Sequence, residues 1–327
     1  MFDYLSDGRW WDRGLQLMEG CTKVSPGCDN CWSLDAANMR RFNPNPKTRA
    51  RYEGTVARSD CGTPQWTGQV NPQWQDLDKI GRARKPQVYT FWNDLFHPGV
   101  EEEFVTSAMC RIVSHPQHFY IICTKRPERA LAYFQLCYKD FVAEDDKDWP
   151  GRLYREVFAT RLMLMTTAEN QAMADKRIRD LLMIPGVMHG VSHEPALGMV
   201  DWRPWLKPGL ESWCKGHPES PKPNFPGGYS RKLSGIDLLI AGGETGPRAR
   251  ASHPDFFRQD RDQAVAAGVP FFLKSLGKWA QCDESQDVFS KKEGFHTLPG
   301  NQCFKRVGKK AAGRTLDGRT WDEVPKI

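Results

Sequence analysis

The sequence predicts an α/β protein whose parallel β-strands form a partial or complete (β/α) barrel. Short apolar runs rich in β-branched and aromatic residues alternate along the chain with longer segments of helical periodicity. Apolar runs separated by helices indicate parallel strands that are covered on at least one face. Six or seven consecutive units of this kind favour a barrel, and an open doubly wound sheet is the alternative.

Each unit consists of one predicted strand and the helix or loop that follows it. The strands are predicted at residues 15–20, 88–93, 118–123, 162–167, 187–192, 236–242 and 270–274. The helices are predicted near residues 32–42 and over residues 101–114, 127–138, 171–183 and 254–267.

Three segments interrupt this alternation and are expected to be insertions around the mouth of the barrel. Residues 43–84 are polar and contain prolines, residues 139–155 are charged, and residues 203–234 are rich in Pro, Gly and Ser. The barrel with its insertions is expected to span residues 1–280. Residues 281–327 are expected to form a basic C-terminal extension.

The composition indicates a globular protein that works in the cytoplasm. No run approaches the roughly 20 apolar residues that a membrane helix needs, and no signal peptide is visible at the N-terminus. Ten cysteines in a reducing compartment are better explained as thiols and a metal site than as disulfides. The net charge of +6 is compatible with a nucleic-acid partner but does not establish one.

Three cysteines lie close together in the stretch GCTKVSPGCDNCW, at Cys21, Cys28 and Cys31. They could be unconnected thiols, although three in eleven residues makes that the weakest alternative. They could bind zinc, which would need a fourth ligand such as Cys61 or a histidine. They could instead hold an iron–sulfur cluster of four irons with three protein ligands. The open iron of such a cluster can bind S-adenosylmethionine, and an electron passed through the cluster then cleaves it to a 5′-deoxyadenosyl radical.

A cysteine loop directly after the first strand of a (β/α) barrel resembles the radical SAM superfamily. The usual superfamily spacing is C-x3-C-x2-C, whereas this chain has C-x6-C-x2-C. Six ordered blocks are more specific, and over about residues 15–280 they resemble the bacteriophage three-cysteine-motif family. The blocks are GCTKVSPGCDNCW, FWNDLFHPGV, CTKRPER, SHEPALG, AGGETGPRARASHPD and AAGVPFFLKSLGKW.

This resemblance implies a phage enzyme with a 4Fe-4S cluster, S-adenosylmethionine and an electron donor such as flavodoxin or ferredoxin. It further implies an isomerase of thymidine hypermodification in viral DNA. Such an isomerase would rearrange a glycyl group on the thymine methyl carbon from the carbon-linked to the nitrogen-linked form. The alternative is a zinc- or cluster-containing phage protein that binds nucleic acid or senses redox state without turnover.

Polar or glycine residues follow nearly every predicted strand. Chemistry in a parallel barrel gathers at the carboxyl ends of its strands, so these residues are expected to converge on one mouth. No residue is assigned as catalytic. The candidates for binding S-adenosylmethionine or substrate are Asn93, Asp94, Lys125, Arg126, Glu169, Asn170, Glu194, Gly242, Gly243, Glu244 and Lys274.

Two basic segments, residues 39–52 and 305–314, are candidates for contact with a DNA backbone. A base inside duplex DNA would have to be extruded to reach a pocket at the barrel mouth. Tryptophan side chains could stack on such a base. The candidates are Trp66, Trp74, Trp92 and Trp202.

Overall fold

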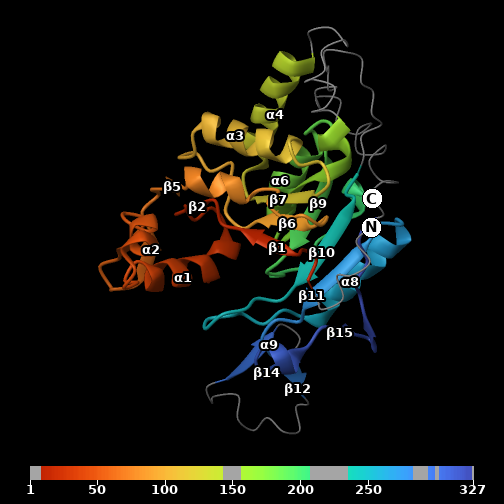
Figure 1. Ribbon diagram of the computed structural model, residues 1–327. Coiled ribbons are helices and arrows are strands. Elements are labelled where there is room, and N and C mark those ends of the chain that lie inside the picture. Colours follow the sequence, from red (N-terminus) through yellow and green to blue (C-terminus); the bar gives the residue numbers. More distant parts are fainter. Residues whose placement is uncertain (1–8, 143–155, 207–234, 283–293, 299–301, 326–327) are drawn as a thin grey trace.

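Seven parallel strands form one curled sheet, a half-barrel, in this computed structural model (Figure 1). The structure describes residues 9–142, 156–206, 235–282, 294–298 and 302–325. The strands lie in the order β1-β6-β7-β8-β9-β10-β11, and β1 and β11 form the two edges. Their bounds are β1 Arg13–Leu15, β6 Val88–Phe91, β7 Phe119–Thr124, β8 Leu162–Thr167, β9 Met188–His193, β10 Leu238–Gly242 and β11 Phe271–Ser275.

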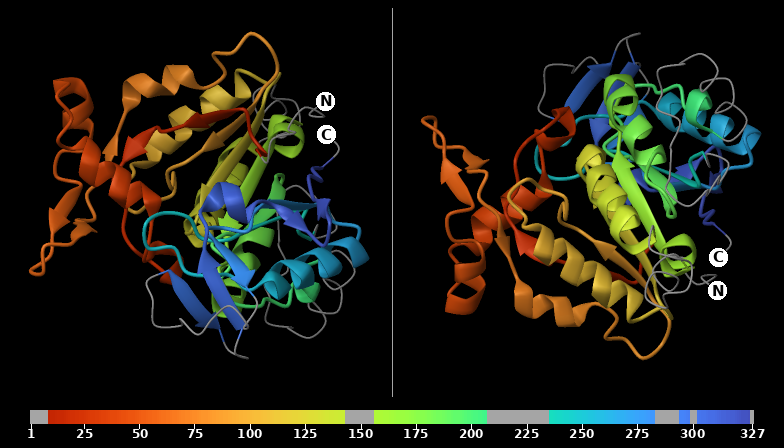
Figure 2. Two further views of the ribbon diagram at one scale, coloured as in Figure 1. Left: turned by 90° about the horizontal axis from the view of Figure 1, so that it is seen from below. Right: turned by 90° about the horizontal axis from the view of Figure 1, so that it is seen from above.

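The strand order follows the order along the chain and never reverses, which distinguishes this sheet from a doubly wound one. The predicted partial barrel is therefore confirmed. Four long helices begin and end within a few residues of the predicted positions and pack on one face of the sheet (Figures 1 and 2). They are α3 Glu102–Val113, α4 Pro127–Val142, α6 Gln171–Leu182 and α8 Pro254–Ala266.

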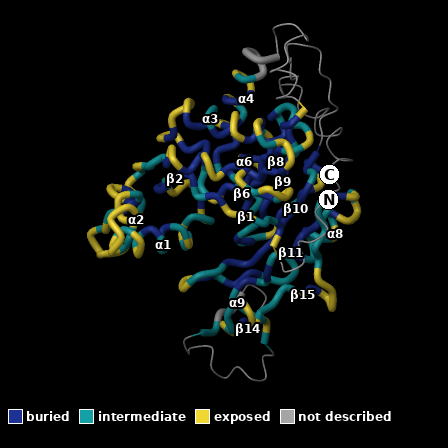
Figure 3. The backbone as a smooth tube through the Cα atoms, viewed as in Figure 1, coloured by how far each residue is buried: buried dark blue, intermediate teal, exposed yellow. Residues whose placement is uncertain are grey.

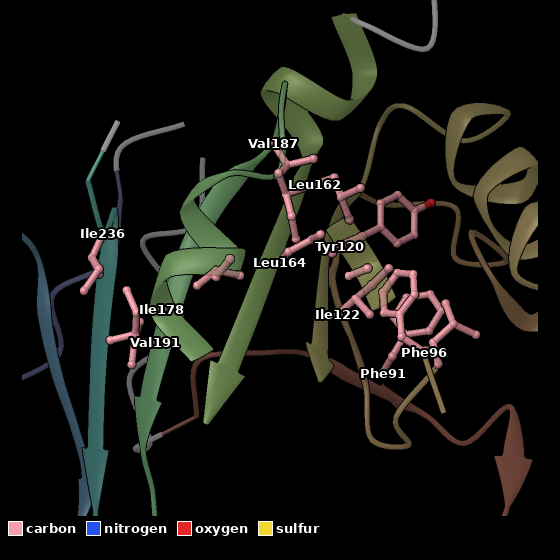
Figure 4. Packing of buried hydrophobic residues seen from close by; sticks show 14 of the residues in the cluster. Phe91, Phe96, Tyr120, Ile122, Leu162, Leu164, Ile178, Val187, Val191 and Ile236 are labelled. Carbon is pink, nitrogen blue, oxygen red and sulfur yellow. The ribbon is translucent and has the colours of Figure 1, made fainter. Parts of the chain in front are cut away.

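The core follows from the two-residue alternation of the strands. In β7, Tyr120 and Ile122 point toward the helices, where they join Leu164 of β8 and Ile178 of α6 (Figure 4). Ile121 belongs to a second buried cluster on the opposite, concave face of the sheet. The strands are consequently buried on both faces (Figure 3). Each such side chain contributes about 1.5–3 kcal/mol by its burial.

The first strand differs from the prediction at residues 15–20. The strand of the main sheet is the short β1, and the following residues form β2 (Met18–Glu19), which pairs antiparallel with β5 (Asn71–Pro72). Besides this backbone pairing, Arg51 of the insertion approaches the buried carboxylate of Glu19 to 2.9 Å. This contact ties the second half of the predicted strand to the insertion.

The insertion at residues 43–84 is present and projects from the sheet beside β1 (Figure 1). The helix before it, α1, spans Trp32–Arg40 and ends two residues earlier than predicted. The predicted insertions at 139–155 and 203–234 fall mostly outside the described residues, which include only the end of α4 and a short helix η3, Arg203–Trp205. The elements within 43–84 are α2 Pro46–Arg51, β3 Val56–Arg58, β4 Pro64–Trp66, β5 and η2 Trp74–Lys79.

The C-terminal region is more than a basic extension. The amide of Leu273 in β11 donates to the carbonyl of Trp321 at 2.9 Å, and Phe272 forms an isolated β-bridge with Asp322. These contacts cover an edge strand that would otherwise expose unpaired backbone groups. The other elements of this region are β12 Trp279–Cys282, β13 Phe295–Leu298, β14 Gln302–Arg306, α9 Lys309–Ala312, β15 Thr315–Leu316 and β16 Arg319–Thr320.

A search of the described helices found none with the length and the apolar character needed to cross a membrane.

Candidate functional site

A cavity of about 380 Å³ opens at the carboxyl end of the sheet. The ends of β6, β7, β9, β10 and β11 contribute to its walls, together with the cysteine loop, residues 20–33. Parallel strands bring their carboxyl ends to one edge, which is why residues far apart in sequence meet here. The sequence candidates that line the cavity are Cys21, Cys28, Cys31, Asn93, Asp94, Lys125, Arg126, Glu194, Gly243, Glu244 and Lys274.

The cysteine loop has a defined local structure. A short helix η1 spans Pro26–Cys28, and the amide of Cys28 donates to the carbonyl of Ser25 at 2.9 Å. Cys31 occupies the N-cap position of α1, where its carbonyl accepts a hydrogen bond of 3.2 Å from the amide of Leu34. All three thiols are partly buried and free of disulfides.

Glu169 anchors the middle of this loop from the end of β8. It is fully buried, and its Oε1 accepts a hydrogen bond of 2.8 Å from the amide of Gly27. Its Oε2 accepts one of 3.0 Å from Nη1 of Arg177 in α6. Burial opposes ionisation, but bonds from Ser25 and Gly27 and the charges of Lys125 and Arg177 hold the pKa of Glu169 below its usual value. Glu169 therefore supports the loop and does not line the cavity.

Glu244 anchors the same loop from the end of β10. It accepts hydrogen bonds from the Asn30 side chain at 3.1 Å and from Nη2 of Arg250 at 2.6 Å. The same guanidinium donates to the carbonyl of Pro26 at 2.9 Å. The Glu244 hydrogen bond and charge raise the pKa of Arg250, although burial opposes this. A carboxylate with this many protein partners acts mainly in holding the loop.

A third anchor joins the ends of β6 and β7 to the start of the loop. Nη1 of Arg126 lies 2.5 Å from Oδ2 of Asp94, and its Nη2 donates to Thr22. The hydroxyl of Thr124 donates to the other oxygen of Asp94 at 2.6 Å. Burial alone would lower the pKa of Arg126, but the Asp94 charge raises it. The pair is thus a charge-compensated support beneath Cys21.

The three thiols have different electrostatic surroundings. Burial, followed by the Asp94 charge, raises the pKa of Cys21 to about 11, and burial also raises that of Cys31. Burial opposes the ionisation of Cys28 as well. However, Nζ of Lys125 lies 3.4 Å from the Cys28 sulfur, and the lysine charge together with backbone hydrogen bonds lowers the pKa of Cys28. Cys28 is the thiol best prepared to bind a metal as thiolate.

The donor set is suited to a group bound by three thiolates. All three sulfur-bearing residues line the same cavity, and a lysine stands beside one of them. Within the part of the chain that the structure describes, no three His, Cys, Asp or Glu side chains are grouped to hold a metal ion. The thiols would therefore have to turn toward a common centre. Cys61, the suggested fourth zinc ligand, is exposed in the β3–β4 turn and does not line the cavity.

Several predicted binding residues have other roles. Asn170 caps α6 by accepting a hydrogen bond from the amide of Met173 at 3.0 Å, because a short polar side chain satisfies an otherwise unpaired helical amide. Trp202 is fully buried in the core, and Trp74 packs on Phe104 of α3 away from the cavity. Neither can stack on a ligand here.

The sequence analysis missed part of the aromatic wall. Trp66 and Trp92, two of the candidates for stacking on a base, line the cavity, as does Trp10; so do Trp11 and Trp32. Trp92 makes edge-to-face contacts with both of the latter, at centroid distances of 5.4 and 5.7 Å. The position of Trp32 directly after Cys31 was the available signal, whereas nothing in the sequence pointed to Trp11.

The basic segments are engaged in part by the protein itself. Arg51 pairs with Glu19, Arg41 donates to the carbonyl of Val56, and Arg306 donates to the carbonyl of Gly246. These contacts order the arginines and leave parts of their surfaces accessible. A DNA contact by these segments stays a prediction.

Comparison with known proteins identified one family. A family model described as "Protein of unknown function (DUF5131)" matches residues 6–325. The comparisons with curated proteins and with solved structures found no significant match. Because the family model extends over nearly the whole chain, the protein belongs to the family described as protein of unknown function DUF5131.

Proposed function

We propose that this protein is a radical SAM enzyme whose 4Fe-4S cluster is held by Cys21, Cys28 and Cys31. The observation that carries the proposal is the placement of all three thiols on one loop that faces a cavity at the carboxyl end of a parallel half-barrel. Three ligands on a four-iron cluster leave one iron open for S-adenosylmethionine. The cluster and S-adenosylmethionine together would supply a carbon radical that abstracts a hydrogen atom from the substrate.

The residues of the chain prepare this site. Glu169, Glu244 and the Asp94–Arg126 pair fix the cysteine loop from three different strands. Lys125, beside Cys28, adds positive charge next to a cluster that becomes more negative on reduction.

The substrate we propose is a thymidine in viral DNA that carries a glycyl group on its methyl carbon, and the reaction is an isomerisation to the nitrogen-linked form. A hydrogen atom is abstracted first from the glycyl nitrogen, and a hydrogen atom is returned last to the glycyl carbon. In between, the thymine methylene exchanges its bond to the glycyl carbon for a bond to the glycyl nitrogen, so composition and charge are unchanged. Trp92 and Trp32, which are 42% and 50% exposed, offer faces on which an extruded base could stack.

Anaerobic reconstitution with iron and sulfide tests the proposal. We expect about four irons per chain and, with dithionite or a flavodoxin as electron donor, conversion of S-adenosylmethionine to 5′-deoxyadenosine. Nucleoside analysis after incubation with DNA containing the carbon-linked modification then tests the isomerisation.

The matched control is Cys61→Ser, which removes an exposed thiol outside the cavity and should retain iron and cleavage. A colourless protein with stoichiometric zinc would contradict the proposal and favour a nucleic-acid-binding module. An intact cluster that never cleaves S-adenosylmethionine would favour a redox sensor.

A further inference from the structure

Apart from Lys125, whose ammonium lies 3.4 Å from the Cys28 sulfur, the charged side chains around the cavity fall into two groups. Asp94, Arg126 and Glu244 each have several protein partners and hold the cysteine loop. Glu194 and Lys274 have a single polar contact in the described residues, and it joins them to each other. Away from the cysteines, their charges are therefore the ones left with hydrogen-bonding capacity toward a ligand.

The second pair lies at the cavity end of the sheet. In β11, Phe272 belongs to the concave-face cluster, and Lys274 lies where the register with β10 shifts, between the partners of Ala241 and Gly242. In β9, Gly190 faces Met163 and Met165 of that cluster, and Glu194 follows it at an even spacing. Both residues line the cavity.

A glycine makes room for the pair. β10 lies between β9 and β11, and Gly242 at its end stands between the two side chains. A Cβ on Gly242 would lie 3.2 Å from the carboxyl carbon of Glu194, closer than most real contacts of this kind. The absence of a side chain at this position lets the Glu194 carboxylate approach Lys274.

The pair has unused donors and acceptors that face the cavity. Nζ of Lys274 lies 2.7 Å from Oε1 of Glu194, and the side chains are 30% and 19% exposed. A lysine ammonium has three N–H donors and a carboxylate has about four acceptor positions, so one shared bond uses only part of either group. A partly buried ion pair contributes little net stability, which makes a purely structural role a weak explanation for its position.

We propose that Glu194 and Lys274 recognise an α-amino-acid group, with Glu194 accepting from its ammonium and Lys274 donating to its carboxylate. In such a group the ammonium and the carboxylate are attached to the same carbon, so its two charges lie close together. Glu194 and Lys274 also lie close together and have the opposite charges. The ligand binds without breaking the ion pair, through the free oxygen of Glu194 and a free N–H of Lys274. The neutral edge of a nucleobase would compensate the charges of Glu194 and Lys274 less well. The identity of the ligand as a glycyl-bearing nucleoside rests on the proposed function.

Binding of four deoxyuridines to the full chain tests this inference without turnover. Their substituents at carbon 5 are 2-amino-2-carboxyethyl, 2-aminoethyl, 2-carboxyethyl and methyl. Free glycine at millimolar concentration is a fifth probe, and ligand-observed NMR detects its binding. S-adenosylhomocysteine is a sixth, because its amino-acid group could be the one recognised. We expect the first nucleoside to bind at least tenfold more tightly than the other three.

The variants are Glu194→Gln and Lys274→Gln, with Lys274→Arg to restore the positive charge. Each Gln substitution should weaken binding of the amino-acid nucleoside about tenfold and leave the methyl compound unaffected. Lys274→Arg should recover most of the affinity. The matched control is Arg203→Gln, which breaks an exposed ion pair of the same 2.7 Å length with Asp201. Thermal unfolding of every variant separates lost binding from lost folding.

The outcomes distinguish the inference from the proposed function. If only glycine shows dependence on both residues, the amino-acid site stands and the nucleoside substrate is wrong. If the dependence appears only with S-adenosylhomocysteine, the site serves the methionine group of S-adenosylmethionine. If neither residue affects any amino-acid probe more than Arg203→Gln does, or the methyl compound binds equally well, the inference is overturned. Loss of iron binding or of S-adenosylmethionine cleavage would bear on the proposed function alone.

Discussion

The backbone amide of Gly27 donates a 2.8 Å hydrogen bond to the carboxylate of Glu169, 142 residues further along the chain. This contact connects the cysteine loop to the end of β8. A Cβ on Gly27 would lie 3.0 Å from the same carboxylate, so glycine is needed for so close an approach. The carboxylate also neutralises the buried Arg177. One side chain thus supports both the fold and the position of the loop.

Glu169→Ala should therefore destabilise the protein and loosen the loop. Removing one partner of a buried ion pair leaves an uncompensated charge on Arg177 and costs about 3–5 kcal/mol. Urea denaturation measures this loss in the free energy of unfolding. Asp175→Ala, which removes an exposed carboxylate on the same helix as Arg177, should change stability by less than about 0.5 kcal/mol. Equal effects of the two substitutions would show that Glu169 is not an anchor.

Replacing any of Cys21, Cys28 or Cys31 by alanine should abolish stable iron binding after anaerobic reconstitution. Each thiol would supply one of three protein ligands, and a cluster with two is labile. Iron and sulfide analysis checks the prediction, with Cys61→Ser as the variant that should retain a full complement. Full iron content in a Cys28→Ala protein would exclude Cys28 as a ligand.

His97 should make the stability of the protein depend on pH between about 6.5 and 4. Its Nδ1 accepts from the amide of Gly99 at 3.0 Å, so the ring is neutral and its Nε2 donates to Thr22. Burial and the nearby Arg126 charge lower its pKa to about 4. Below pH 6.5 the unfolded state binds a proton that the native state does not, so native stability falls as the pH decreases.

The measurement is the free energy of unfolding of the wild type and of His97→Gln across this pH range. The difference in the free energy of unfolding between the wild type and His97→Gln should decrease by up to about 3 kcal/mol from pH 6.5 to 4, since 1 pKa unit corresponds to about 1.4 kcal/mol. Protonation of carboxylates affects the stability of both proteins equally, so it does not contribute to this difference. Parallel pH profiles would contradict a neutral native His97.

Trp321 should stabilise the edge of the sheet. Its ring packs on Phe271 of β11 at a centroid distance of 5.9 Å, and the guanidinium of Arg319 lies 3.8 Å from its centroid. Trp321→Ala should lower the free energy of unfolding by about 2–3 kcal/mol through lost packing and a lost cation–π contact. Met199→Ala, at a half-exposed site, is the control and should have little effect. Unchanged stability of Trp321→Ala would show that the C-terminal segment does not support β11.

The strands and helices were predictable where a run was long enough to show its period. The segment Leu162–Thr167 has four consecutive apolar residues followed by two β-branched threonines, and β8 has these bounds in the structure. The first strand was misplaced because β1 is a three-residue edge strand whose Arg13 and Gly14 are exposed, so it has no apolar run. Local periodicity carries no signal for such an element.

The sequence by itself determined a parallel α/β sheet (a partial or complete barrel), the cysteine loop and the edge of the sheet where polar residues gather. Only the tertiary structure decided which of those residues hold the loop and which face the cavity with free capacity. Glu244 and Glu194 are both carboxylates that follow a strand. Arg250 and Asn30 donate hydrogen bonds to Glu244, whereas among the described residues the Glu194 carboxylate has a polar contact with Lys274 alone. The physical reason is that hydrogen-bond partners are selected by distance in space. Contacts such as that between Arg250 and Pro26, 224 positions apart, leave no trace in the local pattern of the chain.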